Sequence, residues 1–168
     1  MSRIFLVGLP GVGKTTVAEA LAEHWGSVAL DTDDLVSSAV GMPAATYLRR
    51  EGEAAFRDRE VDVLKAALED EATTVIATGG GIVCSPRARE ALAEAFTIWL
   101  DCDDDVILSR LGDVDRPLLS QDPSETLARL RREREGWYAE VSRARVETSA
   151  PVVDVIAAIT REVDRLSR

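Results

Sequence analysis

The segment that most restricts how this chain can fold is Gly8-Leu-Pro-Gly-Val-Gly-Lys-Thr15, close to the N-terminus. It follows the short apolar run Ile4–Val7, which is typical of a buried strand, and precedes Thr15–Trp25, where apolar residues recur at helical spacing. The segment matches G-x-x-x-x-G-K-[ST] at every fixed position, and a strand before it and a helix after it are the context that this pattern needs. It therefore predicts a phosphate-binding loop within an α/β fold.

The residue types of the loop predict how it would hold a nucleotide. Glycines let the loop curl around phosphate oxygens, so that backbone N–H groups and the positive end of the helix dipole face them. The ammonium of Lys14 is expected to reach the β- and γ-phosphates as a catalytic group, and the hydroxyl of Thr15 to ligate Mg²⁺. No guanine signature of the N-K-x-D type occurs, which favours ATP. The expected nucleotide contacts are Gly11, Val12, Gly13, Lys14, Thr15 and Thr16.

Strand-like and helix-like segments alternate through the rest of the chain. Further strands are expected at Val28–Leu30, Thr74–Thr78, Phe96–Leu100 and Val146–Thr148. Helices are expected at Leu35–Val40, Glu53–Leu68, Pro86–Ala95, Asp104–Leu111, Ser124–Tyr138 (with Ser124 as its N-cap) and Pro151–Leu166. Such alternation is typical of a parallel sheet covered by helices on both faces. The 168 residues therefore predict one three-layer α/β domain, 1–168, with a five-stranded parallel sheet.

The overall composition excludes several classes of function. The net charge of −10 argues against nonspecific binding to nucleic acid or to an anionic membrane. No apolar run approaches the roughly 18–20 residues of a membrane-spanning helix, and the N-terminal segment lacks a signal-peptide pattern, so we expect a cytoplasmic protein. Cys84, Cys102 and His24 are the only residues of their kinds, so a structural zinc site is not expected.

Two carboxylates follow the second expected strand. In open α/β sheets, ligands bind beyond the carboxyl ends of the strands, so Asp31 and Asp33 should face the phosphate loop. One carboxylate can support Mg²⁺ through water, and the other can accept the proton of an attacking hydroxyl. A structural alternative is that Asp33 or Asp34 caps the helix that follows, and capping is compatible with catalysis.

Three further features lie where a second substrate would bind. Gly79–Gly81 ends the third expected strand, and glycines there let a ligand approach backbone N–H groups, with a plain turn as the alternative. Arg57 lies on an amphipathic helix, where an arginine is usually solvated. Arg116 lies in the long loop Gly112–Pro123, and such loops are often lids. We expect Arg116 to close over the transferring phosphate and to spread its charge.

Taken together and in this order, these elements resemble the shikimate kinases. The segments that carry the resemblance are Leu30-Asp-Thr-Asp33, Gly52-Glu-Ala-Ala-Phe-Arg57 with Glu60 after it, Gly79-Gly-Gly-Ile82, Arg116-Pro-Leu-Leu119, and Arg134 four residues before Tyr138. The resemblance covers almost the whole chain. It implies a fold like that of the nucleoside-monophosphate kinases. It also implies phosphorylation of the 3-hydroxyl of shikimate by ATP with Mg²⁺, on the pathway to chorismate and the aromatic amino acids.

The resemblance implies an acceptor site in the region of about 32–60 together with residues that follow it. Asp33 would bind the shikimate hydroxyls and act as the catalytic base or orienter, and Arg57 and Arg134 would hold the carboxylate. The implied substrate-binding residues are Asp33, Arg57, Gly79, Gly80, Gly81 and Arg134. We also expect alanine at Gly80 to damage acceptor binding more than fold stability.

On the nucleotide side, the resemblance implies that Arg116, within a lid of about 112–123, meets the γ-phosphate. Asp31 would support Mg²⁺ together with Thr15. Arg110 matches an arginine that stacks near the adenine, and Pro151 belongs to the loop on the adenine side. The family is commonly monomeric, so a monomer is expected.

Two departures and two alternatives remain open. Many members of the family have Pro and Leu where this chain has Gly136 and Trp137, which predicts altered packing with the arginine retained. The expected lid is unusually acidic. The alternatives are another small-molecule kinase of the same fold, such as a gluconate or nucleoside-monophosphate kinase, and a non-catalytic nucleotide-binding paralogue.

Overall fold

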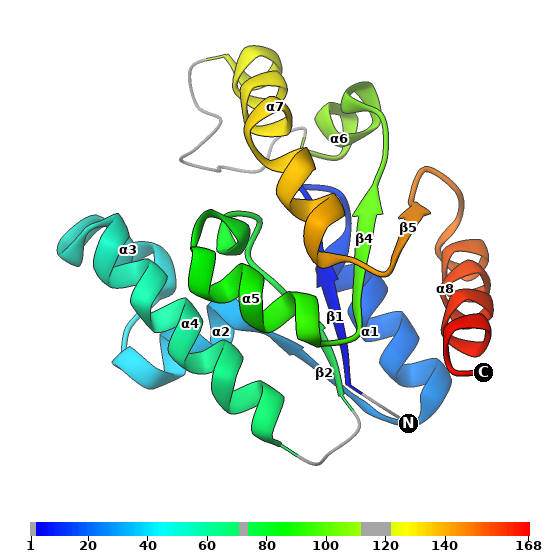
Figure 1. Cartoon of the computed structure of the whole chain (residues 1–168). Helices are drawn as coiled ribbons and strands as arrows, with labels where there is room; N and C mark the ends of the chain where they lie inside the picture. The colour runs from blue at the N-terminus through cyan, green and yellow to red at the C-terminus, as the bar shows by residue number, and fades with distance from the viewer. Residues whose placement is uncertain (1–2, 71–73, 112–121) are drawn as a thin grey trace.

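A parallel sheet lies at the centre of the computed structural model, which describes residues 3–70, 74–111 and 122–168. The strands are β1 (Ile4–Val7), β2 (Val28–Asp31), β3 (Thr74–Ala77), β4 (Thr97–Asp101) and β5 (Ala144–Glu147). They are hydrogen-bonded in the order β2-β3-β1-β4-β5, and every pair is parallel. Because the strands run the same way, all five carboxyl ends lie at one edge of the sheet (Figure 1).

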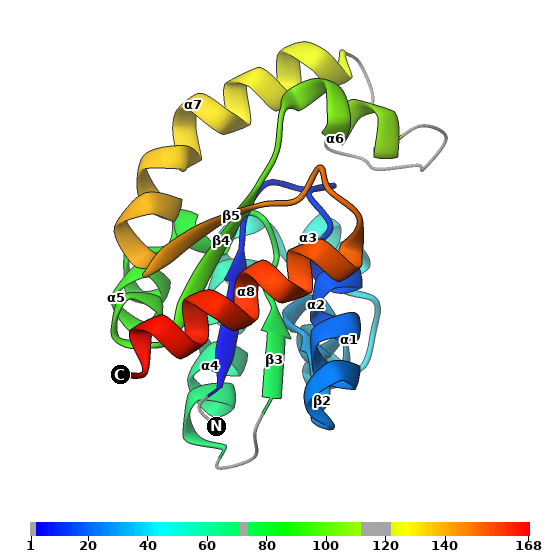
Figure 2. The ribbon, with the colours of Figure 1, turned by 90° about the vertical axis from the view of Figure 1, so that its right-hand side faces the viewer.

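Helices cover both faces of the sheet, as the alternating pattern predicts. The helices are α1 (Lys14–Trp25), α2 (Thr32–Val40), α3 (Ala44–Glu51), α4 (Glu53–Glu69), α5 (Pro86–Glu94), α6 (Asp104–Leu111), α7 (Pro123–Val141) and α8 (Val152–Leu166), with a short 3₁₀ turn at Ile82–Cys84. Helices α1 and α8 pack together on one face, and α4, α5 and α7 on the other (Figures 1 and 2). The three-layer α/β fold with a five-stranded parallel sheet is therefore confirmed.

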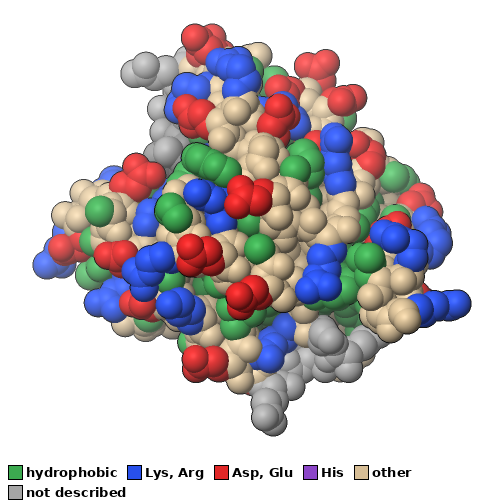
Figure 3. Space-filling view, in the orientation of Figure 1, with side chains coloured by type: hydrophobic (Ala, Val, Ile, Leu, Met, Phe, Trp, Pro, Cys, Tyr) green, Lys and Arg blue, Asp and Glu red, His purple; other side chains and the backbone are tan. Residues whose placement is uncertain are grey.

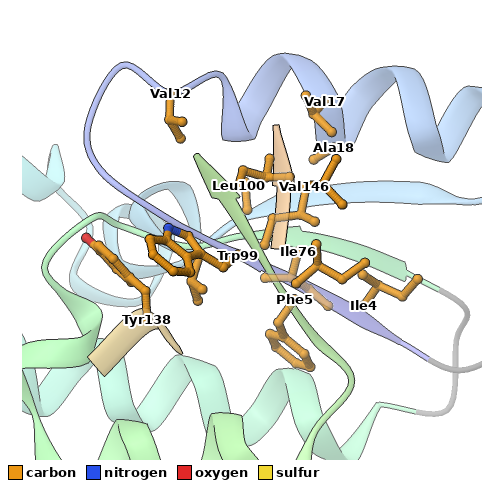
Figure 4. Close-up of a cluster of buried hydrophobic side chains, with 14 of the residues drawn as sticks. Ile4, Phe5, Val12, Val17, Ala18, Ile76, Trp99, Leu100, Tyr138 and Val146 are labelled. Carbon is orange, nitrogen blue, oxygen red and sulfur yellow. The ribbon is translucent and has the colours of Figure 1, made fainter. Parts of the chain in front are cut away.

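Apolar side chains fill both spaces between the sheet and its helices. The residues of β1 and β4 are buried throughout, as expected for central strands covered on both faces. Figure 4 shows Val17 and Ala18 of α1 close to Leu100 and Val146, with Phe5 on the opposite side of the sheet. A smaller second cluster lies under α2, α3 and α4, outside the main core.

Several predicted boundaries were wrong. Helix α3 was not expected, because Gly41, Pro43 and Gly52 flank a short segment in which Ala44 is the one buried residue. The last strand begins two residues earlier than predicted, at Ala144.

Helix caps were also misplaced by the sequence analysis. Helix α2 is capped by Asp31, and neither Asp33 nor Asp34 is its N-cap, because the Asp31 side chain accepts from the backbone N–H of Asp33. Helix α7 is capped by Asp122 in place of Ser124, because the Asp122 carboxylate accepts from the N–H of Glu125 at 3.0 Å. In both helices an aspartate outside the expected segment bonds an N–H that the helix itself leaves open.

Within the described residues, none of the helices combines the length and the apolar character that crossing a bilayer requires. Acidic and basic side chains are interspersed on the face seen in Figure 3.

Candidate active site

The loop between β1 and α1 presents unpaired backbone donors. Helix α1 begins after Gly13, whose φ of 103° lies in a region that favours glycine, and no side chain caps the helix. The first N–H groups of the helix therefore have no intrahelical partner. The ammonium of Lys14 is buried and donates to the carbonyl oxygens of Gly8 at 2.8 Å and Leu9 at 2.9 Å. Lys14 thus lies across a loop whose free donors suit a phosphate.

Two oxygen ligands suitable for a hard cation lie next to this loop. The hydroxyl of Thr15 donates to one carboxylate oxygen of Asp31 at 2.9 Å, while the other oxygen caps α2. Within the described ranges, no group of three His, Cys, Asp or Glu side chains is arranged to hold a metal. Mg²⁺ usually keeps several waters and takes only one or two protein oxygens with substrate phosphates. The Thr15–Asp31 pair fits that requirement.

Of the two predicted adenine-side residues, Arg110 lies against the loop that leads to Pro151. Arg110, at the end of α6, donates to the carbonyl oxygen of Val12 at 3.0 Å and to the carbonyl oxygen of Thr148. Thr148 lies three residues before Pro151, the N-cap residue of α8. The guanidinium of Arg110 therefore lies where the phosphate loop and the loop before α8 meet. Arg116, and residues 112–121 of the expected lid, lie outside the described residues.

Asp33 faces the end of β3. Its carboxylate oxygen lies 3.1 Å from the position that a Cβ on Gly79 would occupy. Although the residue as a whole is accessible, partial desolvation of its carboxyl raises the pKa, and the neighbouring carboxylate of Asp31 raises it further. Lys14 and Arg57 oppose that rise. Asp33 is thus a carboxylate between the phosphate loop and the arginine of α4.

Arg57 pairs with a buried acid that the sequence analysis gave no role. Its guanidinium donates to Glu60, one turn further along α4, and the Glu60 side chain is 1% exposed. Burial raises the pKa of Glu60 to about 7, although the charge of Arg57 acts to lower it. The spacing of three residues on one helix face was the available signal for this pair.

Arg134, on α7, supplies a second cation beside Glu60, and this one is buried. It is only 7% exposed, and its Nε and Nη1 atoms are buried without a hydrogen-bond partner among the described residues. The same holds for Nε of Arg57 and Oε1 of Glu60. Buried charged groups without partners are costly, so these atoms indicate a space that a polar ligand or water fills. An anion there would be bound by both arginines.

The glycine triplet forms the wall between this space and the phosphate loop. The N–H of Gly79 donates to the hydroxyl of Thr32 at 2.9 Å, whereas those of Gly80 and Gly81 have no hydrogen-bond partner among the described residues. A Cβ on Gly80 would lie 2.8 Å from Cδ of Pro10, and a Cβ on Gly81 would lie 2.2 Å from Nη2 of Arg57. The triplet therefore has no room for side chains, because Gly80 is packed against Pro10 and Gly81 against Arg57.

Tyr138 fixes the triplet from α7, a role that was also missed. Its hydroxyl donates to the carbonyl oxygen of Gly80, and burial raises the pKa of the phenol, so it remains a donor. Its ring lies beside Trp99 of β4, with centroids 6.1 Å apart (Figure 4). One helix therefore holds both Arg134 and the tether of the glycine wall.

Comparison with known proteins places this arrangement in a family. The shikimate kinase family model matches residues 10–164. A shikimate kinase from Symbiobacterium thermophilum is 40% identical over 166 residues, which is 95% of each chain. The solved shikimate kinase from Acinetobacter baumannii in complex with shikimate is 34% identical, with a TM-score of 0.90 over 97% of this chain and 93% of that one.

A gluconokinase from Sinorhizobium meliloti is much less similar. It is 18% identical, with a TM-score of 0.66 over 98% of this chain and 93% of that one, and so shares only the fold. The choice between these two kinase families rests on the family match and on the shikimate kinase relative, which is 40% identical over 95% of its length. This chain belongs to the shikimate kinase family.

Proposed function

We propose that the protein transfers the γ-phosphoryl group of ATP to the 3-hydroxyl of shikimate, giving shikimate 3-phosphate and ADP. Membership of the family supports the reaction, and the related Acinetobacter enzyme was solved with shikimate. In this reaction the hydroxyl oxygen forms a bond to the γ-phosphorus as the bond to the β-bridging oxygen breaks. The hydroxyl proton leaves the acceptor.

The observation that carries the acceptor assignment is the pair of arginines, Arg57 and Arg134, whose buried nitrogens lack hydrogen-bond partners among the described residues. Shikimate is a small carboxylic acid, and guanidinium groups bind carboxylates through paired charge-assisted hydrogen bonds. The open nitrogens of Arg57 and Arg134 supply such donors. The free N–H groups of Gly80 and Gly81 supply neutral donors at the same wall.

Asp33 is the proposed base or orienter of the attacking hydroxyl. Its raised pKa favours proton acceptance, and it lies between the cationic groups of the two loops. A loose phosphoryl-transfer transition state needs little help from a base, so orientation of the hydroxyl alone is compatible with this role.

On the nucleotide side, Lys14 and the free N–H groups of the loop would hold the β- and γ-phosphates. Thr15 and Asp31 would hold Mg²⁺, which neutralises charge on the transferring phosphate. Arg110 and Pro151 are proposed for the adenine side. Arg116 and the lid of about 112–123 stay part of the proposal, together with a single domain, a monomer and a cytoplasmic location.

An ADP-release assay with several acceptors tests the function. Shikimate, gluconate and nucleoside monophosphates would be compared at equal concentration with ATP and Mg²⁺. We expect turnover with shikimate to exceed that with the others by orders of magnitude. Faster turnover of gluconate or of a nucleotide would replace the acceptor assignment. Binding of ATP without turnover of any acceptor would instead favour the non-catalytic alternative.

A further inference from the structure

The outer side of the phosphate loop is held by a threonine that has no role in the function described so far. Thr148 directly follows β5 and is 3% exposed. Its hydroxyl oxygen lies 2.9 Å from the carbonyl oxygen of Val12, in the middle of the loop. The same carbonyl also accepts from Arg110 at 3.0 Å. Two donors, from α6 and from the residue after β5, therefore fix the direction of the Val12 carbonyl.

The direction of the Val12 carbonyl also fixes the direction of the N–H of Gly13, because both belong to one peptide group. The peptide between Val12 and Gly13 is trans and planar, so its N–H points opposite to its carbonyl. When the Val12 carbonyl is held outward, the N–H of Gly13 faces the inside of the loop. That N–H has no partner among the described residues. Gly13 is the N-cap residue of α1, and no side chain caps this helix. The direction of one phosphate donor is thus set on the opposite side of the loop.

Thr148 is itself fixed to the sheet, so it can act as a rigid support. Its backbone N–H donates to the carbonyl oxygen of Asp101, at the end of β4, at 2.8 Å. Its hydroxyl lies 3.3 Å from that same oxygen and 2.9 Å from the Val12 oxygen. A hydroxyl has one proton, and its contact with the Val12 oxygen is the shorter of the two. The proton therefore goes to Val12, while the hydroxyl oxygen accepts from Arg110 at 3.4 Å.

We propose that Thr148 is a positioning residue for nucleotide binding: its hydroxyl orients the Val12–Gly13 peptide so that the Gly13 N–H meets a phosphate of ATP or ADP. The proposal rests on the proposed function only in that the loop binds a nucleotide. It assigns Thr148 no contact with the nucleotide or the acceptor.

The chain offers a matched control for the loss of a buried threonine hydroxyl. Thr97 is the first residue of β4, at the amino ends of the strands and thus opposite the phosphate loop, and it is fully buried. Its hydroxyl donates to the carbonyl oxygen of Leu92 at 2.7 Å, which is the same kind of bond. The variants Thr148→Val and Thr97→Val each remove one such bond with little change of shape. Thr148→Ser keeps the hydroxyl at the site.

The test measures ADP affinity by calorimetry, the melting temperature, and the KM for shikimate. We expect Thr148→Val to weaken ADP binding about three- to tenfold, the size of one lost hydrogen bond of about 1 kcal/mol. Thr148→Ser should bind ADP as the wild type does. Thr97→Val should match Thr148→Val in melting temperature while keeping wild-type ADP affinity. The KM for shikimate should change little in all three.

Three outcomes would overturn the proposal. They are wild-type ADP affinity in Thr148→Val, equal loss of affinity in Thr97→Val, and failure of Thr148→Ser to restore binding. If Thr148→Val does not fold, Thr148→Ala removes the same hydroxyl: a loss of ADP affinity that leaves the KM for shikimate intact would support the proposal, and wild-type affinity would overturn it. A wild-type protein that fails to bind ADP would instead refute nucleotide binding itself.

Discussion

The phosphate loop and the proposed acceptor site, here called the acceptor space, are assembled from the chain in opposite ways. The loop is made from consecutive residues, Gly8–Thr15, and offers mainly backbone donors. The acceptor space takes its charged groups from three separate elements, with Asp33 on α2, Arg57 on α4 and Arg134 on α7. The first depends on the local path of the chain. The second depends on the packing of helices that are distant in sequence.

The two regions also differ in how their polar groups are satisfied. In the loop, the Lys14 ammonium is hydrogen-bonded to carbonyl oxygens of its own loop. In the acceptor space, side-chain atoms of Arg57, Glu60 and Arg134 are buried without hydrogen-bond partners among the described residues. Unsatisfied buried charge costs stability unless a ligand or water compensates it. We therefore expect substitutions in the acceptor space to act on substrate affinity and stability together, and loop substitutions mainly on nucleotide binding.

The largest expected effect concerns the residue between the two regions. Asp33→Asn should lower kcat about 10²–10⁴-fold, because an amide cannot accept the hydroxyl proton. The neighbouring Asp34→Asn is the control, since Asp34 is exposed and takes no part in the proposed chemistry. Steady-state kinetics measure both. Turnover of Asp33→Asn equal to that of the control would remove Asp33 from the mechanism.

The next effect tests the acceptor space alone. Arg134→Lys keeps the charge but loses the planar donor set, and should raise the KM for shikimate about 10–100-fold by loss of charge-assisted hydrogen bonds. The KM for ATP should stay within about twofold, the level of a distant site. Arg129→Lys, an exposed position on the same helix, is the control. Equal changes in both KM values would show that the two regions are not separate at α7.

The third prediction concerns stability and pH. The folded pKa of Glu60 is raised to about 7 from an ordinary value of 4.5, so the folded state binds the extra proton between these values. Its contribution to the free energy of unfolding is therefore full below about pH 4.5 and is lost as the pH rises through 7. Relative to Glu60→Gln, the wild type should lose about 3 kcal/mol across that range, at about 1.4 kcal/mol for each unit of pKa.

Denaturant unfolding of both proteins at half-unit steps from pH 4.5 to 8.5 measures this difference. The groups that face Glu60 are Arg57, Asp33 and Arg134, and all three remain in the variant. A difference that does not change with pH would mean that the Arg57 pairing keeps Glu60 ionised throughout.

The smallest effect tests whether the boundary between the regions falls inside the glycine triplet. Gly81→Ala would displace the Arg57 guanidinium and should raise only the KM for shikimate. Gly80→Ala would press on Pro10 of the phosphate loop, so the KM for ATP should also rise, which modifies our expectation from sequence. Each change should be about three- to tenfold, as for loss of one ordinary contact. A shikimate-only effect of Gly80→Ala would place the boundary on its other side.

Local patterns predicted the phosphate loop and the alternation of strands and helices along the chain. The residues Asp31, Asp33 and Gly79–Gly81 were also located, because carboxyl ends of parallel strands must meet. The roles of Tyr138 and Thr148 were not predictable in this way. Tyr138 bonds a residue 58 positions away, and Thr148 one 136 positions away. A tyrosine within a helix and a threonine after an edge strand have no local signature of such partners.

Gly80 lies where the loop after β3 meets the phosphate loop at Pro10. The two loops are packed so closely that a Cβ on Gly80 would lie only 2.8 Å from Cδ of Pro10. Phosphoryl transfer needs the reacting atoms about 3–3.5 Å apart at the start of the step. A side chain at Gly80 would push these two loops apart, and with them the groups that are proposed to hold the donor and the acceptor. A residue without a side chain at this position therefore keeps the two proposed binding regions close enough for the transfer step.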